Sequence, residues 1–395
     1  MQKAKKILFV HEVSYEDKVI FEMHEFPELL SLRGHQVYFL DYREGRPQKT
    51  SRFVQKKLIQ GRVFPNARIN LWSMNCYFRE PFGRILVALI ATFKMGKILD
   101  DIQPDVVVLY SVPTSGWQLI KAAKKRNLPV VHRSIDVSHL LRVGPWKKIV
   151  KMTERFVFRN ANQVIANNAE LARYVASHRT HSVGVSVLPP GYLYSTVDIV
   201  PWNETTEFDF VFMGTLFRFC GLRWFIDQMS MSPYGMDRTL LIIGDGEDAL
   251  RLKAMVKDLG LDSRVTFTGF VNFQDLSKQI ARATVAILPF EEIPVANFAL
   301  PGKAMQYIKF GRPVVATRLT GLSTVLPSGK GIIYAGSGPH FLKCAVDLLN
   351  SPKKCSEIVQ SGQGLLQTEL LWDEVLKEFE DLLNKAIVDR KSIVR

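Results

Sequence analysis

The stretch "PDVVVLYSVPTSGWQLIKAAKKRNLPVVHRS", residues 104–134, decides the fold class of this 395-residue chain. It contains an apolar run at 106–109, a helical pattern from residue 116 and a second apolar run that ends near residue 134. The apolar runs do not alternate with polar residues, which is typical of parallel strands covered by helices on both faces. A strand, a helix and a strand in this order predict a doubly wound α/β domain.

The same pattern extends through the first half of the chain. Apolar runs stand at 6–10, 35–42 and 162–168, with helical patterns between them. Residues 43–84 show a looser mixture of basic and aromatic residues. The stretch "FGRILVALIATFKMGKIL" at 82–99 reads as a basic amphipathic helix, and two interpretations stay open: a helix in a lipid interface, or a crossover helix packed on the sheet.

A second α/β series follows a segment rich in proline and turn formers, "VLPPGYLYSTVDIVPWNETTE". We therefore expect a first α/β domain over 1–190, a linker over 191–207, a second α/β domain over 208–370 and a helix over 371–395 that packs back towards the first domain. Two such domains predict a cleft, with ligands held at the carboxyl ends of the strands.

Composition indicates a globular protein and the kind of partner it would attract. The hydrophobic content of 47% is that of a globular protein, and the longest uncharged apolar run, 85–93, is too short to span a bilayer. Residues 1–190 hold 30 Lys and Arg against 15 Asp and Glu, whereas the remainder holds 22 against 23. A basic half attracts phosphorylated or membrane-surface partners, although a solvated face without a partner stays open. Cys76, Cys220, Cys344 and Cys355 lack metal-site spacing and are expected to be reduced thiols, as in the cytosol.

"PGKAMQYIKFG" at 301–311 has the features of an anion site. Gly302 leaves backbone N–H groups open to a ligand, and Lys303 stands at the positive end of the expected helix, where it would meet a diphosphate. Gln306 lies one turn on, and its amide suits a ribose diol. The alternative is a solvated lysine and a surface amide. The nearby "IIGDGED", with Gly244 and Asp245, lacks the full dinucleotide fingerprint.

Several motifs in order carry a family resemblance. "FVFMGT", "LLIIGDGEDALRLKAMVKDLGLDSRVTFTGFV", "ARATVAILPF" and "LPGKAMQYIKFGRPVVAT" resemble the donor half of GT-B-fold glycosyltransferases of the family 4-like superfamily. "RGHQV", "ERFVFRNANQVIANNAELARYV" and "VLPPGY" resemble counterparts in the first half. The resemblance implies two Rossmann-like doubly wound parallel-sheet domains facing a central cleft, and a nucleotide-sugar donor, with UDP the expected nucleotide.

The chain departs from the commonest branch of that superfamily. Where retaining members carry two glutamates eight positions apart, this chain has Phe298 and Gln306. The Lys-x-x-Gln-Tyr helix is more similar to the branch typified by the bacterial xanthan glucuronosyltransferase. That similarity implies a phosphate role for Lys303, a ribose role for Gln306 and a packing role for Tyr307, and it favours inversion at the anomeric carbon.

An inverting transfer needs a base for the acceptor hydroxyl. Asp136 follows the strand "LPVV", and the xanthan enzyme resembles this stretch in its Arg-x-x-Asp order, with the aspartate as base. The alternative for Asp136 is a helix N-cap. The further expected acceptor contacts are His11, Glu12, His24 and His132.

The expected donor contacts lie on the loops of the second domain. They are Gly214, Thr215 and Arg218 after its first strand, Gly244 and Asp245, Val271 beside the nucleobase, Glu291 and Glu292 near the sugar or ribose, and Gly302. No D-x-D motif is present, so we expect neither a metal nor a cofactor, with lysine and helix N-termini meeting the leaving-group charge.

Together these inferences predict a cytoplasmic glycosyltransferase, peripheral to the inner face of the plasma membrane. Its partners would be a UDP-sugar, a lipid-linked glycan acceptor and an anionic membrane surface, and not nucleic acid. Two alternatives stay open: a nucleotide-sugar epimerase or phosphorylase of the same fold, and a non-catalytic protein that binds a nucleotide or glycan.

Overall fold

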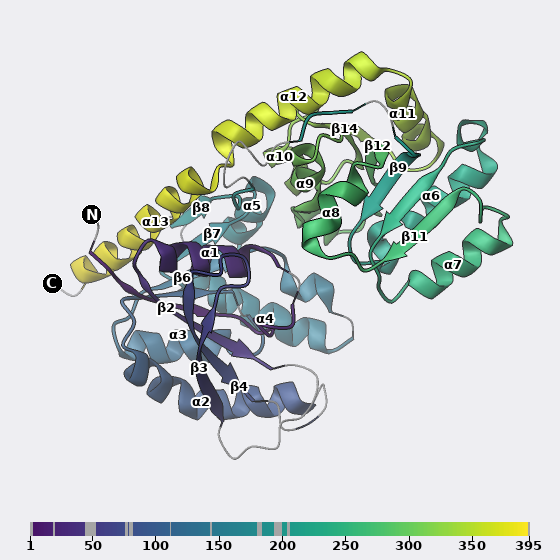
Figure 1. Cartoon of the computed structure of the whole chain (residues 1–395). Coiled ribbons are helices and arrows are strands. Elements are labelled where there is room, and N and C mark those ends of the chain that lie inside the picture. The colour runs from purple at the N-terminus through teal and green to yellow at the C-terminus, as the bar shows by residue number, and fades with distance from the viewer. Residues whose placement is uncertain are drawn as a thin grey trace. The chain divides into compact units, whose positions relative to one another are not determined.

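The computed structural model describes residues 3–18, 20–43, 53–75, 78, 82–110, 112–142, 144–179, 184–192, 200–203 and 206–393. The chain forms two compact units (Figure 1). Unit 1 comprises Met1–Pro190 with Val375–Arg395, and unit 2 comprises Gly191–Glu374. The end of the chain therefore belongs to the same unit as its beginning.

Unit 1 is built on an eight-stranded sheet in the order β3-β4-β2-β1-β5-β6-β7-β8. All neighbouring strands are parallel except β3, which runs antiparallel to β4. The central strands β1, β5 and β6 consist of buried residues apart from Lys6, which explains their unbroken apolar sequences. The strands are β1 (Lys6–Val10), β2 (Gln36–Tyr42), β3 (Val54–Gln60), β4 (Arg68–Met74), β5 (Val106–Leu109), β6 (Val130–Ser134), β7 (Gln163–Ala166) and β8 (Val185–Val187).

Helices cover both faces of this sheet (Figure 1). On one face α2 (Phe82–Ile102), α3 (Gly116–Lys125) and α4 (Trp146–Asn160) share an apolar core with alternate residues of β1, β2 and β5. On the other face α1 (Glu22–Leu32) contacts the C-terminal α13 (Trp372–Ile393), with the rings of Phe26 and Phe379 4.4 Å apart. The 3-10 helix η1 (Ser138–Leu141) packs on α4, and α5 (Ala169–Ser177) packs on β7 and β8.

Unit 2 is built on a six-stranded, wholly parallel sheet in the order β11-β10-β9-β12-β13-β14. One face packs against α6, α7 and α11, and the other against α8, α9 and α10. The strands are β9 (Phe208–Met213), β10 (Leu240–Ile243), β11 (Val265–Gly269), β12 (Ala283–Leu288), β13 (Val314–Thr317) and β14 (Ile332–Ala335). The helices are α6 (Leu222–Met231), α7 (Ala249–Asp258), α8 (Phe273–Ile280), α9 (Lys303–Lys309), α10 (Thr320–Val325), α11 (Pro339–Leu349) and α12 (Pro352–Glu369), with short 3-10 turns η3 (Arg218–Cys220), η4 (Pro233–Gly235) and η5 (Ala296–Phe298).

The strand orders confirm the predicted class of two α/β domains with parallel sheets. Sheets of this kind bind ligands at the carboxyl ends of the strands, where the strand order reverses. In unit 1 the order reverses between β1 and β5, and in unit 2 between β9 and β12.

Two further expectations have structural counterparts. Cys220, Cys344 and Cys355 are free thiols, while Cys76 lies outside the described residues. Among the helices that the structure describes, none has the length and apolarity needed to cross a bilayer.

Candidate active site

Lys303 lies at the reversal point of the unit 2 sheet. Its Nζ is 4.4 Å from the ring centroid of Phe212 on β9 and 5.2 Å from that of Phe290, which follows β12. The atom is shielded from solvent and has no hydrogen-bond partner among the described residues. Burial lowers its pKa to about 8, against a smaller opposing effect of Cys220. Among the described residues, this buried ammonium is therefore in contact with aromatic rings and has no anionic partner to balance its charge.

Two glycines shape the space around this ammonium. A Cβ on Gly214 would lie 2.7 Å from Nζ of Lys303, and a Cβ on Gly244 would lie 2.1 Å from the carbonyl oxygen of Gly214. Both glycines have φ near +130°, which L-residues with a side chain rarely adopt. A side chain at Gly214 would therefore displace the ammonium of Lys303, and one at Gly244 would collide with the backbone of Gly214.

Helix α9 places the other two residues of the Lys-x-x-Gln-Tyr pattern. Tyr307 is buried, and its hydroxyl accepts a hydrogen bond from the backbone N–H of Met213 at 2.5 Å. It therefore fixes the end of β9 next to Gly214. Gln306 is partly exposed, and a Cβ on Gly302 would lie 3.4 Å from the ring of Tyr192.

The remaining candidate donor contacts differ in whether they are bonded to the loop that follows Gly214. The carbonyl of Asp245 accepts from Leu216, and the N–H of Glu291 donates to Phe219, so both tie to the loop that follows Gly214. Val271 packs against the apolar cluster under α8 and α9. The side chains of Thr215, Arg218, Asp245 and Glu292 are exposed. Arg223, which is not among the predicted contacts, forms a two-pronged ion pair with buried Asp248 that joins the start of α6 to the start of α7.

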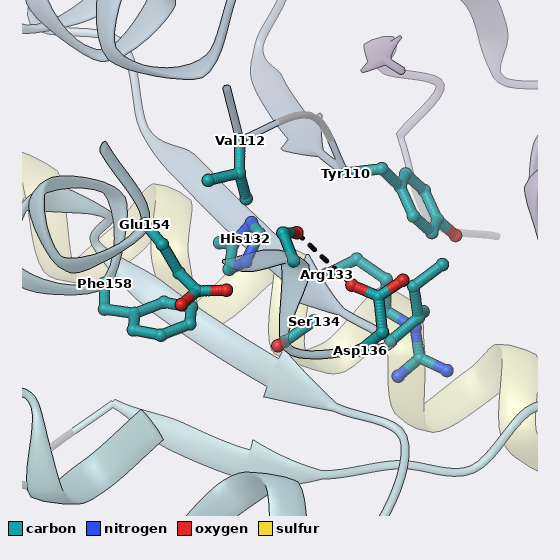
Figure 2. A pocket seen from close by; sticks show the side chains of 10 residues that line it. Tyr110, Val112, His132, Arg133, Ser134, Asp136, Glu154 and Phe158 are labelled. Carbon is teal, nitrogen blue, oxygen red and sulfur yellow. Dashed lines mark hydrogen bonds between the residues drawn. The ribbon is translucent and has the colours of Figure 1, made fainter. Parts of the chain in front are cut away.

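In unit 1, Asp136 lines a small pocket between β6 and α4 (Figure 2). One carboxylate oxygen accepts a hydrogen bond from Oγ of Ser138 at 3.2 Å, drawn as the dashed line. Burial raises the pKa of Asp136 to about 6, helped by the charge of Glu12 and opposed by Ser138 and Arg142. The residue preceding η1 is Val137, and no side chain caps that helix, so the N-cap alternative for Asp136 is not realised.

A second carboxyl group, which sequence reasoning missed, lines the same pocket. Glu154 of α4 is 1% exposed, and its Oε2 lies 2.6 Å from Nδ1 of His139. Burial, followed by the charge of Asp136, raises the pKa of Glu154 to about 8. Its Oε1 and the Oγ of Ser134 are both buried without a hydrogen-bond partner among the described residues.

Three of the four predicted acceptor residues gather near this pocket. His132 lines it, with Nδ1 2.7 Å from the carbonyl of Leu109, and burial lowers its pKa to about 4. Glu12 accepts from the hydroxyl of Thr114 at 2.6 Å and so bridges the loops after β1 and β5 at the reversal point. The ring of His11 stacks on Tyr110, another pocket residue, at 5.2 Å.

His24 is the exception. It lies on α1, is fully buried, and has Nε2 2.8 Å from the carbonyl of Tyr15 and Nδ1 3.3 Å from that of Phe21. Its ring joins the loop before α1 to the helix and is not among the residues that line the pocket, so its expected sugar contact stays a prediction.

Another buried pair holds the strand that carries the site. Arg133 of β6 donates two 2.7 Å hydrogen bonds to Glu22 at the start of α1, and its Nη1 donates to the carbonyl of Leu188 at 2.6 Å. A buried charge needs such pairing. In the sequence, only the charge of Arg133 inside an otherwise apolar strand indicates that such a pair exists.

Comparisons with known proteins match both units of the chain to glycosyltransferases. A family model described as "Glycosyltransferase Family 4" matches residues 23–192, and one described as "Glycosyl transferases group 1" matches 207–351. A relative named "Uncharacterized glycosyltransferase MJ1607", from Methanocaldococcus jannaschii, is 28% identical over 170 residues, which are 42% of each chain. The match thus spans less than half the length of that curated relative.

Two solved structures share the fold along almost the whole chain. Sucrose-phosphate synthase from Thermosynechococcus elongatus is 15% identical, with a TM-score of 0.73 over 98% of this chain and 100% of the other. Anabaena Alr3699/HepE in complex with UDP is 14% identical, with a TM-score of 0.69 over 96% and 100%. The two glycosyltransferase family models together match 23–192 and 207–351, so the chain belongs to the group 1/family 4-like superfamily of GT-B glycosyltransferases.

Proposed function

We propose that this protein transfers a sugar from a nucleotide-sugar donor to a hydroxyl group, with Lys303 at the donor phosphates and Asp136 as the base. The observation that carries the proposal is the buried, unpartnered ammonium of Lys303 at the reversal point of a parallel sheet. That place is where such sheets bind nucleotides, and a buried ammonium there suits a phosphate group.

The chemistry follows from the charges of the two groups. A carboxyl with a pKa of about 6 is largely ionised at pH 7 and is a stronger base than an ordinary aspartate. Asp136 would take the proton of the acceptor hydroxyl as that oxygen attacks the anomeric carbon. The bond from this carbon to the diphosphate oxygen breaks, and Lys303 would stabilise the negative charge that develops on the leaving group.

The finer assignments belong to the same proposal. UDP is the proposed nucleotide because the Anabaena neighbour was solved with UDP. Inversion, independence of metal ions and membership of the branch typified by the xanthan glucuronosyltransferase are proposed from Lys303, Gln306 and Tyr307 and from a single base at Asp136. The ribose would meet Gln306, which is partly exposed one turn after Lys303.

A lipid-linked glycan is the proposed acceptor, met at the inner face of the plasma membrane. The support is the charge distribution: residues 1–190 carry the whole net positive charge of the chain. A basic surface raises the local concentration of substrates that carry a diphosphate and sit among anionic lipids.

The test separates binding from catalysis. A thermal-shift screen of nucleoside diphosphates and their sugars should give a concentration-dependent rise of the melting temperature with the correct nucleotide. Asp136→Ala should keep that shift and lose about 10²- to 10⁴-fold in transfer, the usual range for a general base. Asp101→Ala, on the exposed end of α2, serves as the control and should keep both.

Other outcomes would redirect the assignment. Nucleotide binding without transfer from any donor to any acceptor would favour the non-catalytic protein. Turnover of the donor sugar without an acceptor would favour an epimerase. Full transfer by Asp136→Ala would remove Asp136 from the mechanism.

A further inference from the structure

Helix α2 exposes a row of large apolar side chains on the side that does not pack against the sheet. Phe82, Ile85, Leu89 and Phe93 are exposed, Phe93 by 83%, and their spacing of three to four residues aligns them along the helix. Val87, Ala91 and Met95 on the opposite side are buried in the core of unit 1. The row is about 16 Å long at 1.5 Å per residue. A single exposed apolar residue is ordinary, whereas four in register form a surface.

Helix α4 has a second row of the same kind. Trp146, Ile149 and Met152 are exposed at every third position, Met152 by 72%, while Val150 and Val157 face the core. Lys147 and Lys148 flank the row, and both are exposed. The helix before it, η1, adds exposed Leu141.

The two rows belong to one layer. Helix α3 packs against both α2 and α4, and all three cover the same face of the sheet (Figure 1). The three helices contain eleven basic and three acidic residues. Of the acidic residues, Glu154 is buried, Asp100 pairs with Arg126 and Asp101 pairs with Lys56. The layer therefore presents apolar rows among lysines whose charge its own carboxylates do not neutralise.

We infer that the outer side of the α2–α3–α4 layer binds an anionic lipid surface, with the apolar rows among the acyl chains and the lysines at the headgroups. A lipid interface offers both chemistries at once, which is the pattern of helices that lie in the plane of a membrane. A second copy of this chain would bring lysines against lysines. Nucleic acid would use the charge and leave the apolar rows in water.

This inference deepens the proposed function by naming the surface that would bring the protein to a membrane-bound acceptor. It is tested without sugar transfer, so the two can fail separately. The full chain is mixed with vesicles of phosphatidylcholine, with and without phosphatidylglycerol, at low and raised salt, and the floated fraction is measured. The melting temperature of every variant is recorded without nucleotide to show that it is folded.

Two pairs of substitutions probe the two contributions. Leu89→Ser with Phe93→Ser removes apolar contact on α2, and Lys147→Gln with Lys148→Gln removes charge on α4. The matched controls lie on α7 of unit 2: Leu250→Ser, at a residue 82% exposed, and Lys253→Gln with Lys257→Gln.

We expect the unmodified protein to float with anionic vesicles at low salt and to be released by salt, as a screened charge interaction requires. Each pair on α2 or α4 should weaken partitioning at least tenfold, and the α7 controls should behave like the unmodified chain. Absence of flotation, or equal loss in the α7 controls, overturns the inference. Dimerisation lost in the α2 variant, without vesicle binding, would assign the surface to a second copy, and equal binding to an oligonucleotide would assign it to charge alone.

Discussion

Lys303 combines a buried side chain with a charge that no described residue balances. Its ammonium has left water without gaining a hydrogen bond, and the rings of Phe212 and Phe290 replace only part of the lost hydration. A charge in this situation is stabilised further by an anion. The energetic gain on binding a diphosphate is correspondingly large, because one partner is already desolvated.

Replacing this ammonium should weaken nucleotide binding. Lys303→Met should lower the affinity for UDP by about 10- to 100-fold, the worth of one hydrogen bond to a charged group. In the unmodified protein the affinity should also fall above pH 8, because the free lysine loses its proton near that pH. Isothermal titration at pH 7 and 9 measures both effects, and the variant should show no such decline.

Lys309 provides the control for this measurement. It stands in the last turn of the same helix and is partly exposed, so Lys309→Met should bind UDP as the unmodified protein does. Equal losses in the two variants would mean that the general charge of α9, rather than the position of Lys303, attracts the nucleotide.

Glu154 makes stability depend on pH. Its pKa rises on folding to about 8, so between pH 4.5 and pH 8 the folded protein keeps a proton that the unfolded chain releases. Stability from this group is therefore complete below pH 4.5 and is lost as the pH rises through 8. Glu154→Gln cannot ionise at this position. Its free energy of unfolding, relative to that of the unmodified protein, should therefore rise by about 2 to 4 kcal/mol between pH 5 and pH 8.5.

Urea unfolding at the two pH values measures that difference. Glu170→Gln on α5, where Glu170 pairs with Arg173 at the surface, is the control and should follow the unmodified protein. A constant offset between Glu154→Gln and the unmodified protein at both pH values would show that Glu154 does not titrate in this range.

At the scale of elements, the loops after β9 and β10 depend on backbone that only glycine allows. Gly244→Ala should destabilise unit 2 and reduce UDP affinity, because its Cβ would collide with the carbonyl of Gly214. Gly260→Ala is matched in its positive φ of 65° but has no atom within 4 Å of the added Cβ. Gly260→Ala should lower the free energy of unfolding of unit 2 by about 1 kcal/mol and leave UDP affinity unchanged. Equal affinity losses in both variants would exclude the collision as the cause.

Sequence reasoning located the elements that are buried on both sides and missed those that are not. Strands such as β5 and β12 are apolar throughout because helices cover both faces. The β3–β4 hairpin was not recognised, since β3 contains Lys56 and Lys57 and is largely exposed at the sheet edge. Its register depends on the partner strand rather than on its own pattern.

The candidate site divides in the same way. The Pro-Gly-Lys sequence before a helix indicated Lys303 because backbone chemistry at a helix start is local. Glu154 stands among the basic residues of α4, where a glutamate ordinarily pairs at the surface. Only the packing of η1 on α4 buries it beside Asp136. The roles assigned to the site residues stay predictions until the variants above are measured.

At the scale of the whole molecule, the chain returns to its starting unit. Helix α13 follows all of unit 2 in sequence, yet from Val375 on it belongs to unit 1. Glu380 binds Arg33 and His35, 347 and 345 residues earlier in the chain. Unit 1 is therefore complete only after α13 has been synthesised, whereas unit 2 is continuous in sequence.

Removing the ring contact between α1 and α13 would test whether α13 stabilises unit 1. Phe379 is fully buried against Phe26, so Phe379→Ala should cost unit 1 about 3 to 5 kcal/mol, as for other large cavities in a core. Hydrogen exchange read by mass spectrometry should show faster exchange in β1 and β5, with β9 and β12 unchanged and still protected further by UDP. Val388→Ala, at a position 63% exposed on the same helix, should leave both units as they were. Faster exchange in β9 and β12 of Phe379→Ala would mean that the two units unfold as one, because a cavity confined to unit 1 reaches those strands only through shared cooperativity.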